Sequence, residues 1–505
     1  MDLVRPFVSW RSNKRIEQVD HFKNAPFEMQ EKTLLQLLKK SENTEFGSKY
    51  SFQDITNIDA FQNRVPLHQY EDIKSYIDRV REGEKDVIWP GEIKWFAKSS
   101  GTTSDKSKFI PVSRESLENC HFRGMRDIVL IYCYHYPNTR IFPGKSLTLG
   151  GSTQINSEYN DSYVGDLSAI LMQNSPFLIH LFRAPRKDIA LMEEWEEKLA
   201  RIAQTTVNQN VTSIAGVPSW NLVLLKYILQ YTGKKNILEV WPNLELFMHG
   251  GVSFSPYKEQ FYNIIPSSNM HYMEAYNASE GFFAIQDDPT KDDMLLMLDY
   301  GIFYEFIPFE DIDSENPTVL ALQDVEAGKN YALVITTNAG LWRYVIGDLV
   351  QFTSTNPYRI KISGRTKHFI NAFGEEVIID NAEKALDEAC KKTGASIKEY
   401  TAGPVYFSDE ANGTHEWLIE FEQPPADMSQ FTDILDKTLQ SVNSDYEAKR
   451  YKDITLRRPE VRQMKQGTFY QWMKERGKLG GQNKVPRMAN HRRYLEDILQ
   501  INEKI

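Results

Sequence analysis

The sequence predicts an α/β protein with a large N-terminal domain of helix-covered sheets and a β-meander, followed by a smaller α+β domain. Between about residues 189 and 251 helical and strand patterns alternate, which is typical of a sheet covered by helices. From Met294 to Thr353 short strand-like runs are broken by Pro, Gly and Asn, which indicates an antiparallel meander. A self-contained α+β pattern begins after residue 362, so we expect domains over residues 1–362 and 363–505.

Composition restricts the class of protein. The 505 residues carry a formal charge of -10, which disfavours a generic nucleic-acid-binding surface. Mean hydropathy is -0.49 and no apolar run approaches the length of a membrane span, so we expect no membrane association. The N-terminus lacks a signal-like apolar core, and three widely spaced cysteines fit neither zinc nor a disulfide framework. We expect a cytoplasmic monomer.

The first elements read as core helices. Residues Pro26 to Ser41 predict a helix with Pro near its start and Leu34, Leu35 and Leu38 on one face. A second amphipathic helix carries Ile73, Ile77 and Val80. Neither pattern indicates chemistry.

A hydroxyl-rich loop joins two expected strands, Ile93 to Phe96 and Phe109 to Val112. It contains Ser99, Ser100, Gly101, Thr102, Thr103, Ser104, Asp105, Lys106 and Lys108. Small residues and hydroxyls let the backbone approach a polyphosphate, and ammonium groups neutralise its charge. The loop does not follow the Walker pattern. Taken alone, a solvated Ser/Thr turn is the commoner interpretation.

The middle of the chain supplies helices and glycine-ended strands. Leu117 to Tyr136 predicts a buried helix, on which Arg123 either holds a substrate carboxylate or is a structural arginine. The other expected elements are helices over Ile189 to Thr205 and Pro218 to Gly233, and strands over Val211 to Gly216 and Leu244 to Gly251. We expect His249, at the end of the last strand, to be structural.

Two later motifs place carboxylates beside strands. Tyr276-Asn277-Ala278-Ser279-Glu280 combines a ring that can stack on a base with a carboxylate that can hold a divalent cation; the alternative is an exposed carboxylate at a strand end. Gly347-Asp348 can place a carboxylate at a strand end, where it accepts ribose hydroxyls, or it forms an ordinary β-turn.

The C-terminal region begins with a polar link, Ser363 to Lys367, in which we expect a hinge. The elements expected beyond it are helices over Asn381 to Lys392 and Phe431 to Asn443, strands over Val405 to Phe407 and Trp417 to Phe421, and a turn at Asn412-Gly413. Lys484 follows a glycine pair and precedes Val485-Pro486-Arg487, which places it in a loop.

In this order the motifs resemble the adenylate-forming (ANL) superfamily. The sequence is more similar to the plant auxin-responsive promoter family (Gretchen Hagen 3) of acyl-acid amido synthetases. That resemblance covers nearly the whole chain and rests on NTEFG at 43–47, VPL at 65–67, SSGTT, YEFIP at 304–308, AGLWRYVIGD at 339–348, GTF at 467–469 and QNKVPR at 482–487.

The resemblance implies an ANL-type fold and a reaction in which ATP and a carboxylic acid give an acyl-adenylate, which an amine then attacks. It implies that residues 99–108 grip the β- and γ-phosphates and that Glu280 holds Mg²⁺. Tyr276 would stack on adenine, with Ser279 at the α-phosphate, and Asp348 with Arg365 would hold the ribose. Lys484, on a mobile C-terminal domain, would bridge the attacking carboxylate and the α-phosphate.

Two departures and three activities remain open at this point. Ser104-Asp105 stands where the family loop has glycine, and Tyr-Asn-Ala-Ser-Glu replaces the plant Tyr-Ala-Ser-Ser-Glu. The leading hypothesis is an ATP-dependent ligase joining a carboxylic acid to an amino acid. The alternatives are an acyl-coenzyme A ligase and a non-catalytic adenylate-binding protein. The acid is open as well, because a pocket of apolar residues fixes size only loosely.

Overall fold

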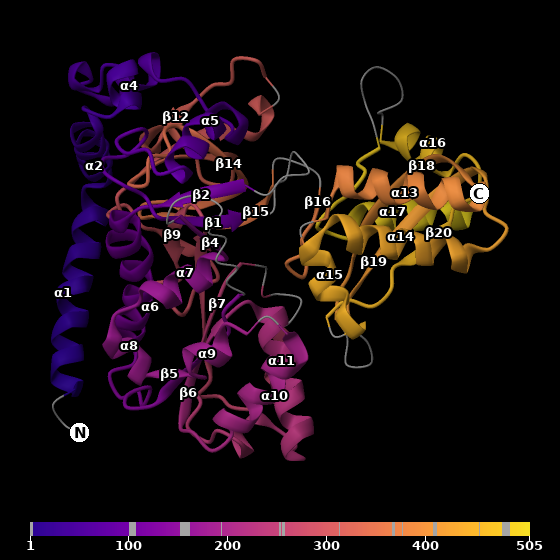
Figure 1. Cartoon of the computed structure of the whole chain (residues 1–505), viewed down its shortest axis with the longest axis horizontal. Coiled ribbons are helices and arrows are strands. Elements are labelled where there is room, and N and C mark those ends of the chain that lie inside the picture. The colour runs from indigo at the N-terminus through magenta and orange to yellow at the C-terminus, as the bar shows by residue number, and fades with distance from the viewer. Residues whose placement is uncertain are drawn as a thin grey trace.

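The computed structural model consists of two lobes, with the C-terminal residues forming the smaller one (Figure 1). It describes the chain apart from residues 1–3, 100–107, 152–161, 193, 252–253, 255–257, 313, 366–368, 376, 408–411, 454 and 477–484. The predicted fold class, a large α/β lobe with a β-meander followed by a smaller α+β lobe, is confirmed.

A twelve-stranded mixed sheet runs through the larger lobe in the order β12-β11-β13-β14-β15-β10-β9-β8-β7-β6-β3-β5. Strands β3 and β5 to β8 pair in parallel, and every pairing from β8 to β12 is antiparallel. Strand β8 is therefore the boundary between a helix-connected half and the meander. A separate sheet has the order β2-β1-β4.

The strands of the larger lobe are β1 (Trp95–Ser99), β2 (Lys108–Val112), β3 (Lys145–Thr148), β4 (Tyr163–Gly165), β5 (Arg183–Ala184), β6 (Val211–Gly216), β7 (Leu246–His249), β8 (His271–Ala278), β9 (Gly281–Ile285), β10 (Met294–Leu296), β11 (Ile302–Pro308), β12 (Leu320–Ala321), β13 (Asn330–Thr337), β14 (Tyr344–Thr355) and β15 (Tyr358–Arg365). Those that follow are β16 (Phe369–Ile370), β17 (Val377–Ile378), β18 (Ser396–Val405), β19 (Thr414–Gln423) and β20 (Glu460–Gln463).

The α-helices of the larger lobe are α1 (Val4–Asn24), α2 (Pro26–Ser41), α3 (Glu45–Lys49), α4 (Ile58–Arg64), α5 (Tyr70–Arg81), α6 (Phe122–His135), α7 (Leu167–Asn174), α8 (Phe177–Leu181), α9 (Lys187–Ala190), α10 (Trp195–Thr206), α11 (Pro218–Thr232) and α12 (Lys258–Ile264). The later ones are α13 (Ile379–Thr393), α14 (Met428–Val442), α15 (Ser444–Arg450), α16 (Thr468–Glu475) and α17 (Arg493–Lys504). A π-helix, Ser116–His121, leads into α6.

Local signals predicted several elements correctly. Helix α2 has the predicted bounds with Pro26 in its first turn, although Leu37, not Leu35, joins Leu34 and Leu38 in the core. Helix α11 begins at Pro218 and ends before Gly233, whose φ of 66° is accessible to glycine without strain.

Other elements differ from the prediction. The helix expected over 189–205 is two helices, because the Glu194 carboxylate accepts the backbone N–H of Glu197 at 2.7 Å and starts α10 afresh. The strand expected at 405–407 ends at Val405, and the expected link at 363–367 begins inside β15. Residues 366–368 lie outside the described part of the chain.

Buried ion pairs fasten the N-terminal helices to the sheet. Arg15 of α1 contacts Asp127 of α6 at 2.7 Å and Asp299 at 2.6 Å. The Arg123 guanidinium donates to both the carboxylate and the backbone carbonyl of Asp299, which supports the structural interpretation of Arg123. Arg343, which precedes β14, binds Glu305 and the carbonyl of Val65.

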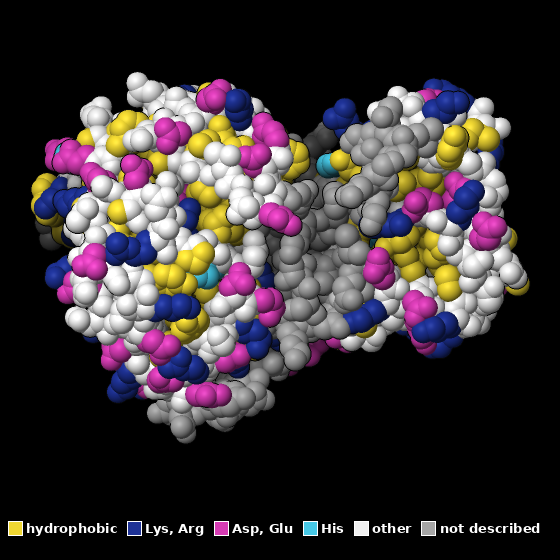
Figure 2. All heavy atoms as spheres, turned by 90° about the horizontal axis from the view of Figure 1, so that it is seen from above, with side chains coloured by type: hydrophobic (Ala, Val, Ile, Leu, Met, Phe, Trp, Pro, Cys, Tyr) yellow, Lys and Arg dark blue, Asp and Glu magenta, His cyan; other side chains and the backbone are white. Residues whose placement is uncertain are grey.

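The two lobes share one apolar cluster. It includes Phe247 of β7 and Leu222 of α11 in the larger lobe, and Phe373 and Trp417 in the smaller one. On the face seen in Figure 2, the described cationic and anionic side chains are interspersed over both lobes. Among the described residues, no helix combines the length and apolar character that a membrane span requires.

Candidate functional site

The β8–β9 hairpin positions the aromatic-to-Glu motif. Tyr276 lies near the end of β8, Ser279 and Glu280 form the turn, and Gly281 begins β9. Glu280 is 9% exposed, so the turn carries a buried carboxylate and not the solvated one of the alternative interpretation. Strand β8 pairs in parallel with β7, so its carboxyl end and the hairpin that follows lie at the same sheet edge as the carboxyl ends of β6 and β7, a common position for ligand loops.

Asp348 meets this hairpin from the neighbouring meander. The Tyr276 hydroxyl donates to the Asp348 carboxylate, and the two residues are 72 positions apart in sequence. Both are buried, at 4% and 5% exposure. The structure thus brings together the residues predicted to hold the adenine and the ribose.

The backbone around Asp348 differs from both sequence interpretations. Asp348 lies inside β14, neither at a strand end nor in a β-turn. The register passes from Val334 opposite Val345 to Ala332 opposite Leu349, so residues 346–348 bulge opposite a single residue. Gly347 permits the bulge with a φ of 93°, where an L side chain is strained.

The hydroxyl-rich loop opens from the end of a hairpin. Ser99 ends β1 and lies opposite Lys108, the first residue of β2. The Lys108 ammonium contacts the Tyr344 hydroxyl at 3.4 Å, so it reaches the strand that carries Asp348. Ser100, Gly101, Thr102, Thr103 and Asp105 lie outside the described residues.

A glycine pair after β7 comes against β8 beside Tyr276. A Cβ on Gly250 would lie 2.2 Å from the carbonyl oxygen of Ala275, so this approach requires glycine. Gly251 has a φ of 83° and its Cβ position lies 3.3 Å from the Val217 side chain. The carboxyl ends of β6 and β7 therefore border the same site as the hairpin.

Asn277 explains one departure from the plant motif. Its side-chain oxygen lies 3.1 Å from Nδ1 of His121 in the π-helix. Burial lowers the pKa of His121 to about 4, so the ring is neutral and its Nδ1–H is the donor to the Asn277 oxygen. Asn277 therefore fastens the hairpin to the π-helix that leads into α6. This pairing was not predicted from the sequence, because His121 and Asn277 are 156 positions apart.

Asn277→Ala, which restores the plant residue, should lower the free energy of unfolding by about 1–3 kcal/mol because the buried His121 donor loses its acceptor. Denaturant unfolding measures the loss. His121→Phe combined with Asn277→Ala removes both polar groups and should recover part of it. Equal stability of Asn277→Ala and the parent chain would contradict this role.

Two predicted residues are only partly placed. Arg365 ends β15 directly opposite Asp348 in the strand register, with its side chain outside the described set. Lys484 is outside it too, but the residues that follow are anchored: the Thr401 hydroxyl donates to the Pro486 carbonyl at 2.7 Å, and the Ala402 N–H to the Arg487 carbonyl at 2.9 Å. The segment that directly follows Lys484 thus belongs to the smaller lobe.

The residues present fit a cation such as Mg²⁺, which keeps several of its waters when bound, better than a metal that is coordinated by protein side chains alone. Mg²⁺ is usually held by one or two carboxylates together with substrate phosphates and waters. Glu280 is a buried carboxylate in the turn between β8 and β9. Within the described ranges, no group of three or more His, Cys, Asp or Glu side chains could hold a metal by itself.

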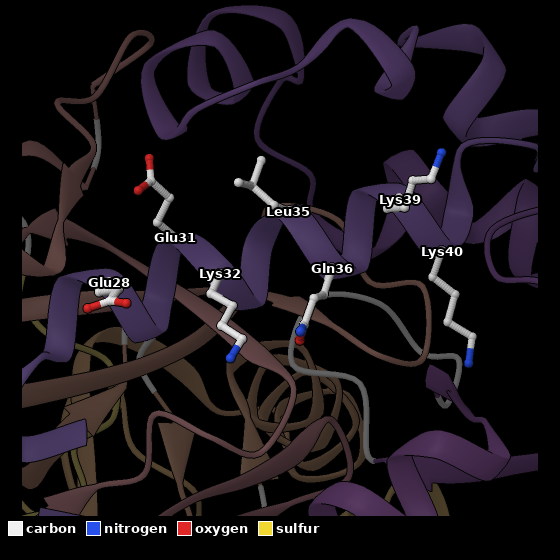
Figure 3. A pocket seen from close by; sticks show the side chains of 7 residues that line it. All are labelled: Glu28, Glu31, Lys32, Leu35, Gln36, Lys39 and Lys40. Carbon is white, nitrogen blue, oxygen red and sulfur yellow. The ribbon is translucent and has the colours of Figure 1, made fainter. Parts of the chain in front are cut away.

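A hollow on the surface runs along α2, away from these motifs. Its lining residues are Glu28, Glu31, Lys32, Leu35, Gln36, Lys39 and Lys40 (Figure 3). Glu31 and Leu35 point to one side of the helix and Lys32 and Lys40 to the other, so no polar groups converge. Lys40 also pairs with Glu115. We therefore place the site by the motif contacts and not by this hollow.

Comparison with solved structures defines the class of fold. The structure is similar to the GH3.15 acyl acid amido synthetase in complex with 2,4-DB, with a TM-score of 0.60 and 19% identity over 94% of this chain and 93% of that one. It also resembles a 2-hydroxyisobutyryl-CoA ligase, with a TM-score of 0.54 and 14% identity over 95% and 93% of the two chains. The predicted ANL-type architecture is thereby confirmed.

The chain belongs to the GH3 family. Family models match the N-terminal domain at residues 15–270, the central domain at 295–365 and the C-terminal domain at 380–493. Its relatives include an indole-3-acetic acid-amido synthetase, GH3.4, of Arabidopsis thaliana, 24% identical over 97% of this chain and 93% of the relative. A 4-substituted benzoates-glutamate ligase, GH3.12, of the same plant is 24% identical over 93% and 94%. The family predicted from the sequence motifs is confirmed.

Proposed function

We propose that this protein is an ATP-dependent acyl-acid amido synthetase that joins a carboxylic acid to an amino acid. The observation that carries the proposal is the contact between the Tyr276 hydroxyl and Asp348, beside the buried Glu280. Each motif would serve a different part of one nucleotide, and two motifs that are far apart in sequence are in contact through Tyr276 and Asp348. The named relatives are an amido synthetase and a ligase, and the sequence match covers nearly their whole length.

In the first half-reaction a carboxylate oxygen attacks the α-phosphorus of ATP and the bond to pyrophosphate breaks. Residues 99–108 would hold the β- and γ-phosphates, and Ser279 would lie at the α-phosphate. Tyr276 would stack on adenine, while Asp348 and Arg365 hold the ribose hydroxyls. Glu280 would hold Mg²⁺, which supplies positive charge against the phosphates.

Lys484 would lie between the attacking carboxylate and the α-phosphate. Two anions must approach each other there, and a cation in a site closed to water stabilises the charge that gathers. In the second half-reaction the amine attacks the acyl carbonyl, AMP leaves, and the amine proton passes to solvent. Exclusion of water protects the acyl-adenylate from hydrolysis.

The two steps fit a division into domains of residues 1–362 and 363–505. Because the segment that follows Lys484 is anchored on β18, movement of the smaller domain would carry Lys484 toward the nucleotide for adenylation and away from it for amide formation. We place the hinge in the polar stretch from Ser363 to Lys367, which begins inside β15. A small-molecule acid, an amino acid and ATP are the partners we propose, for a monomer in the cytoplasm.

A pyrophosphate-release screen tests the activity. Aryl, indolyl and aliphatic acids are supplied with ATP, Mg²⁺ and pooled amino acids, and the products are identified by mass. We expect pyrophosphate and AMP with at least one acid, together with an N-acyl amino acid. A coenzyme A thioester formed in place of the amide would identify an acyl-coenzyme A ligase. No pyrophosphate with any acid would leave a non-catalytic adenylate-binding protein.

A further inference from the structure

Arg183 is a buried arginine of the larger lobe. It begins β5 and is 8% exposed. Among the described side chains, none forms a hydrogen bond or an ion pair with its guanidinium, and its Nη1 atom is itself buried. Burial lowers the pKa of Arg183. An arginine nevertheless stays charged in a protein, so the fold holds a buried cation that lacks a counterion within the described part of the chain.

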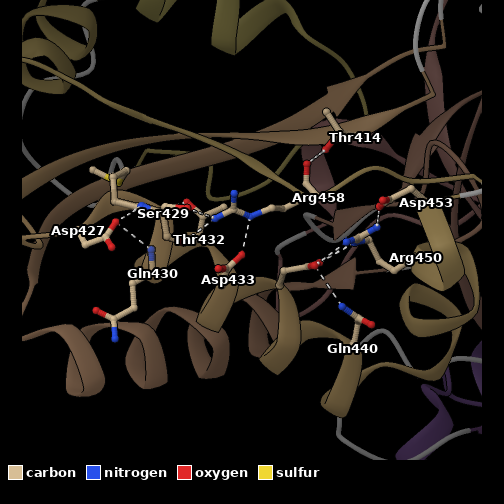
Figure 4. Close-up of polar contacts among 12 residues, drawn as sticks. Thr414, Asp427, Ser429, Gln430, Thr432, Asp433, Gln440, Arg450, Asp453 and Arg458 are labelled. Carbon is tan, nitrogen blue, oxygen red and sulfur yellow. Dashed lines mark hydrogen bonds and ion pairs between the residues drawn. The ribbon is translucent and has the colours of Figure 1, made fainter.

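Other buried arginines of this protein are neutralised. Arg15, Arg343 and Arg359 of the larger lobe are buried as deeply, and each binds at least one carboxylate. In the smaller lobe Arg450 is held by two carboxylates (Figure 4). A buried charge destabilises a fold unless it is paired. Arg183 departs from this pattern, as expected of a residue whose counterion is a ligand.

Two serines continue the line of Arg183 across the sheet. Ser146 of β3 lies in register with Arg183, and Ser213 of β6 lies in register with Ser146. Because side chains alternate along a strand, register partners on neighbouring strands point to the same face. Each hydroxyl can donate to an anionic oxygen, so the row offers one guanidinium and two hydroxyls.

This polar row faces the side of the sheet that α6 and α7 cover. Leu246, in register with Ser213, packs in one apolar cluster with Ile131 of α6 and Ile170 of α7. Leu147, the neighbour of Ser146 on β3, packs in the other cluster, which includes the smaller lobe. The row therefore lies on the face away from the smaller lobe.

The same face leads to the edge that carries the nucleotide motifs. Ser213 is three residues from the end of β6, so the row lies about 10 Å along the strand from that edge. Between them, Ala215 is in register with Met248 of β7. Met248 and, on α6, Met125 and Val129 are only partly buried on this side. These apolar side chains can contact the body of an acid that extends from the edge to the row.

The surroundings of Arg183 are cationic as well. Lys187 follows it by four residues, and the charges of Arg183 and Lys187 add to the effect of burial in lowering the pKa of His180. The Lys187 ammonium contacts the side-chain oxygen of Gln173, a neutral group, at 3.4 Å. Positive charge gathered in this way favours an anion at the row.

We propose that Arg183, with the hydroxyls of Ser146 and Ser213, binds a second anionic group of the acid substrate, at the end remote from the carboxylate that is adenylated. This inference rests on the proposed function and names its substrate class, an extended dicarboxylic acid. The smaller lobe packs on the opposite face, so the acid, and not a substrate held between the lobes, is the ligand that can reach the row. A guanidinium binds a carboxylate through two parallel hydrogen bonds, which favours a diacid over a monocarboxylic acid of equal length.

The test compares Arg183→Met with Arg186→Met, a matched loss of an exposed arginine three positions away. Pyrophosphate exchange is measured with suberic, sebacic and dodecanedioic acids, and with octanoic, decanoic and dodecanoic acids. The parent enzyme should have a lower KM for a diacid than for the monocarboxylic acid of the same length. In Arg183→Met the KM for that diacid should rise roughly 10- to 100-fold, as for a lost charged hydrogen bond. Arg186→Met should keep the parent's preference for the diacid.

Stability without substrate separates ligand binding from a structural role. Because an unpaired buried cation destabilises the fold, Arg183→Met should unfold at a denaturant midpoint equal to or above that of the parent. A lower midpoint would mean that the fold itself needs the cation and would overturn the inference. Equal KM values of the parent enzyme for diacid and monocarboxylic acid, or an unchanged diacid KM in Arg183→Met, would also overturn it and leave the adenylation proposal intact. Adenylation of no acid at all would overturn the proposed function, and this subsite with it.

Discussion

Lys484→Ala should slow acyl-adenylate formation by roughly 10²-fold or more while ATP binding changes little. The reason is that the lysine bridges carboxylate and α-phosphate as charge gathers in the transition state, so its loss affects kcat and not ground-state affinity. Pyrophosphate exchange measures the first half-reaction. Amide formation from a synthetic acyl-adenylate, supplied directly, measures the second and should survive because the lysine has by then moved away.

Lys478→Ala is the matched control, since it removes a lysine from the same stretch that precedes Val485. It should leave both half-reactions near the parent rates. An equal loss of both half-reactions in Lys484→Ala would indicate damage to the domain. An unaffected adenylation rate would contradict the proposed role of Lys484 in the first half-reaction.

Glu280→Gln should reduce adenylation by roughly 10²- to 10³-fold, because the neutral amide keeps the shape of the turn and loses the charge that would hold Mg²⁺ beside the phosphates. Steady-state pyrophosphate release across a range of Mg²⁺ concentrations measures the effect. Raising Mg²⁺ should recover part of the rate, since the metal also binds the nucleotide phosphates.

Glu274→Gln is the control for this substitution. Burial raises the pKa of Glu274 to about 7, so this carboxyl, on the strand β8 that leads into the Glu280 turn, is partly neutral near pH 7 already. Its amide should retain Mg²⁺-dependent adenylation. The metal role of Glu280 would be contradicted if both variants lost the same activity, or if Glu280→Gln had the Mg²⁺ dependence of the parent enzyme.

The parts of the fold that follow from local signals were predictable from the sequence. Pro26, Pro218 and Gly233 mark helix ends through their own backbone preferences, and the alternation of elements predicted the layered sheet. The break between α9 and α10 was not predictable by periodicity, because apolar residues continue across it at helical spacing. There a single side chain, that of Glu194, decides the structure.

The site shows the same division between local and long-range information. The motif residues Tyr276, Glu280 and Asp348 could be named from residue types and family resemblance. The bulge that presents Asp348 depends on its register with β13, a partner that the local sequence does not specify. Asn277 likewise meets His121 across 156 positions of sequence, a contact that only the packing of the hairpin against the π-helix creates.

The most direct test of the central claim follows an oxygen atom. A carboxylic acid that supports pyrophosphate release is labelled with ¹⁸O in both carboxylate oxygens and converted to its amide in the presence of ATP, Mg²⁺ and the acceptor amino acid. If the carboxylate attacks the α-phosphorus, mass spectrometry should find one ¹⁸O in each AMP and the other in the amide carbonyl. Label in inorganic phosphate with ADP as the product, or unlabelled AMP, would contradict the proposed adenylation.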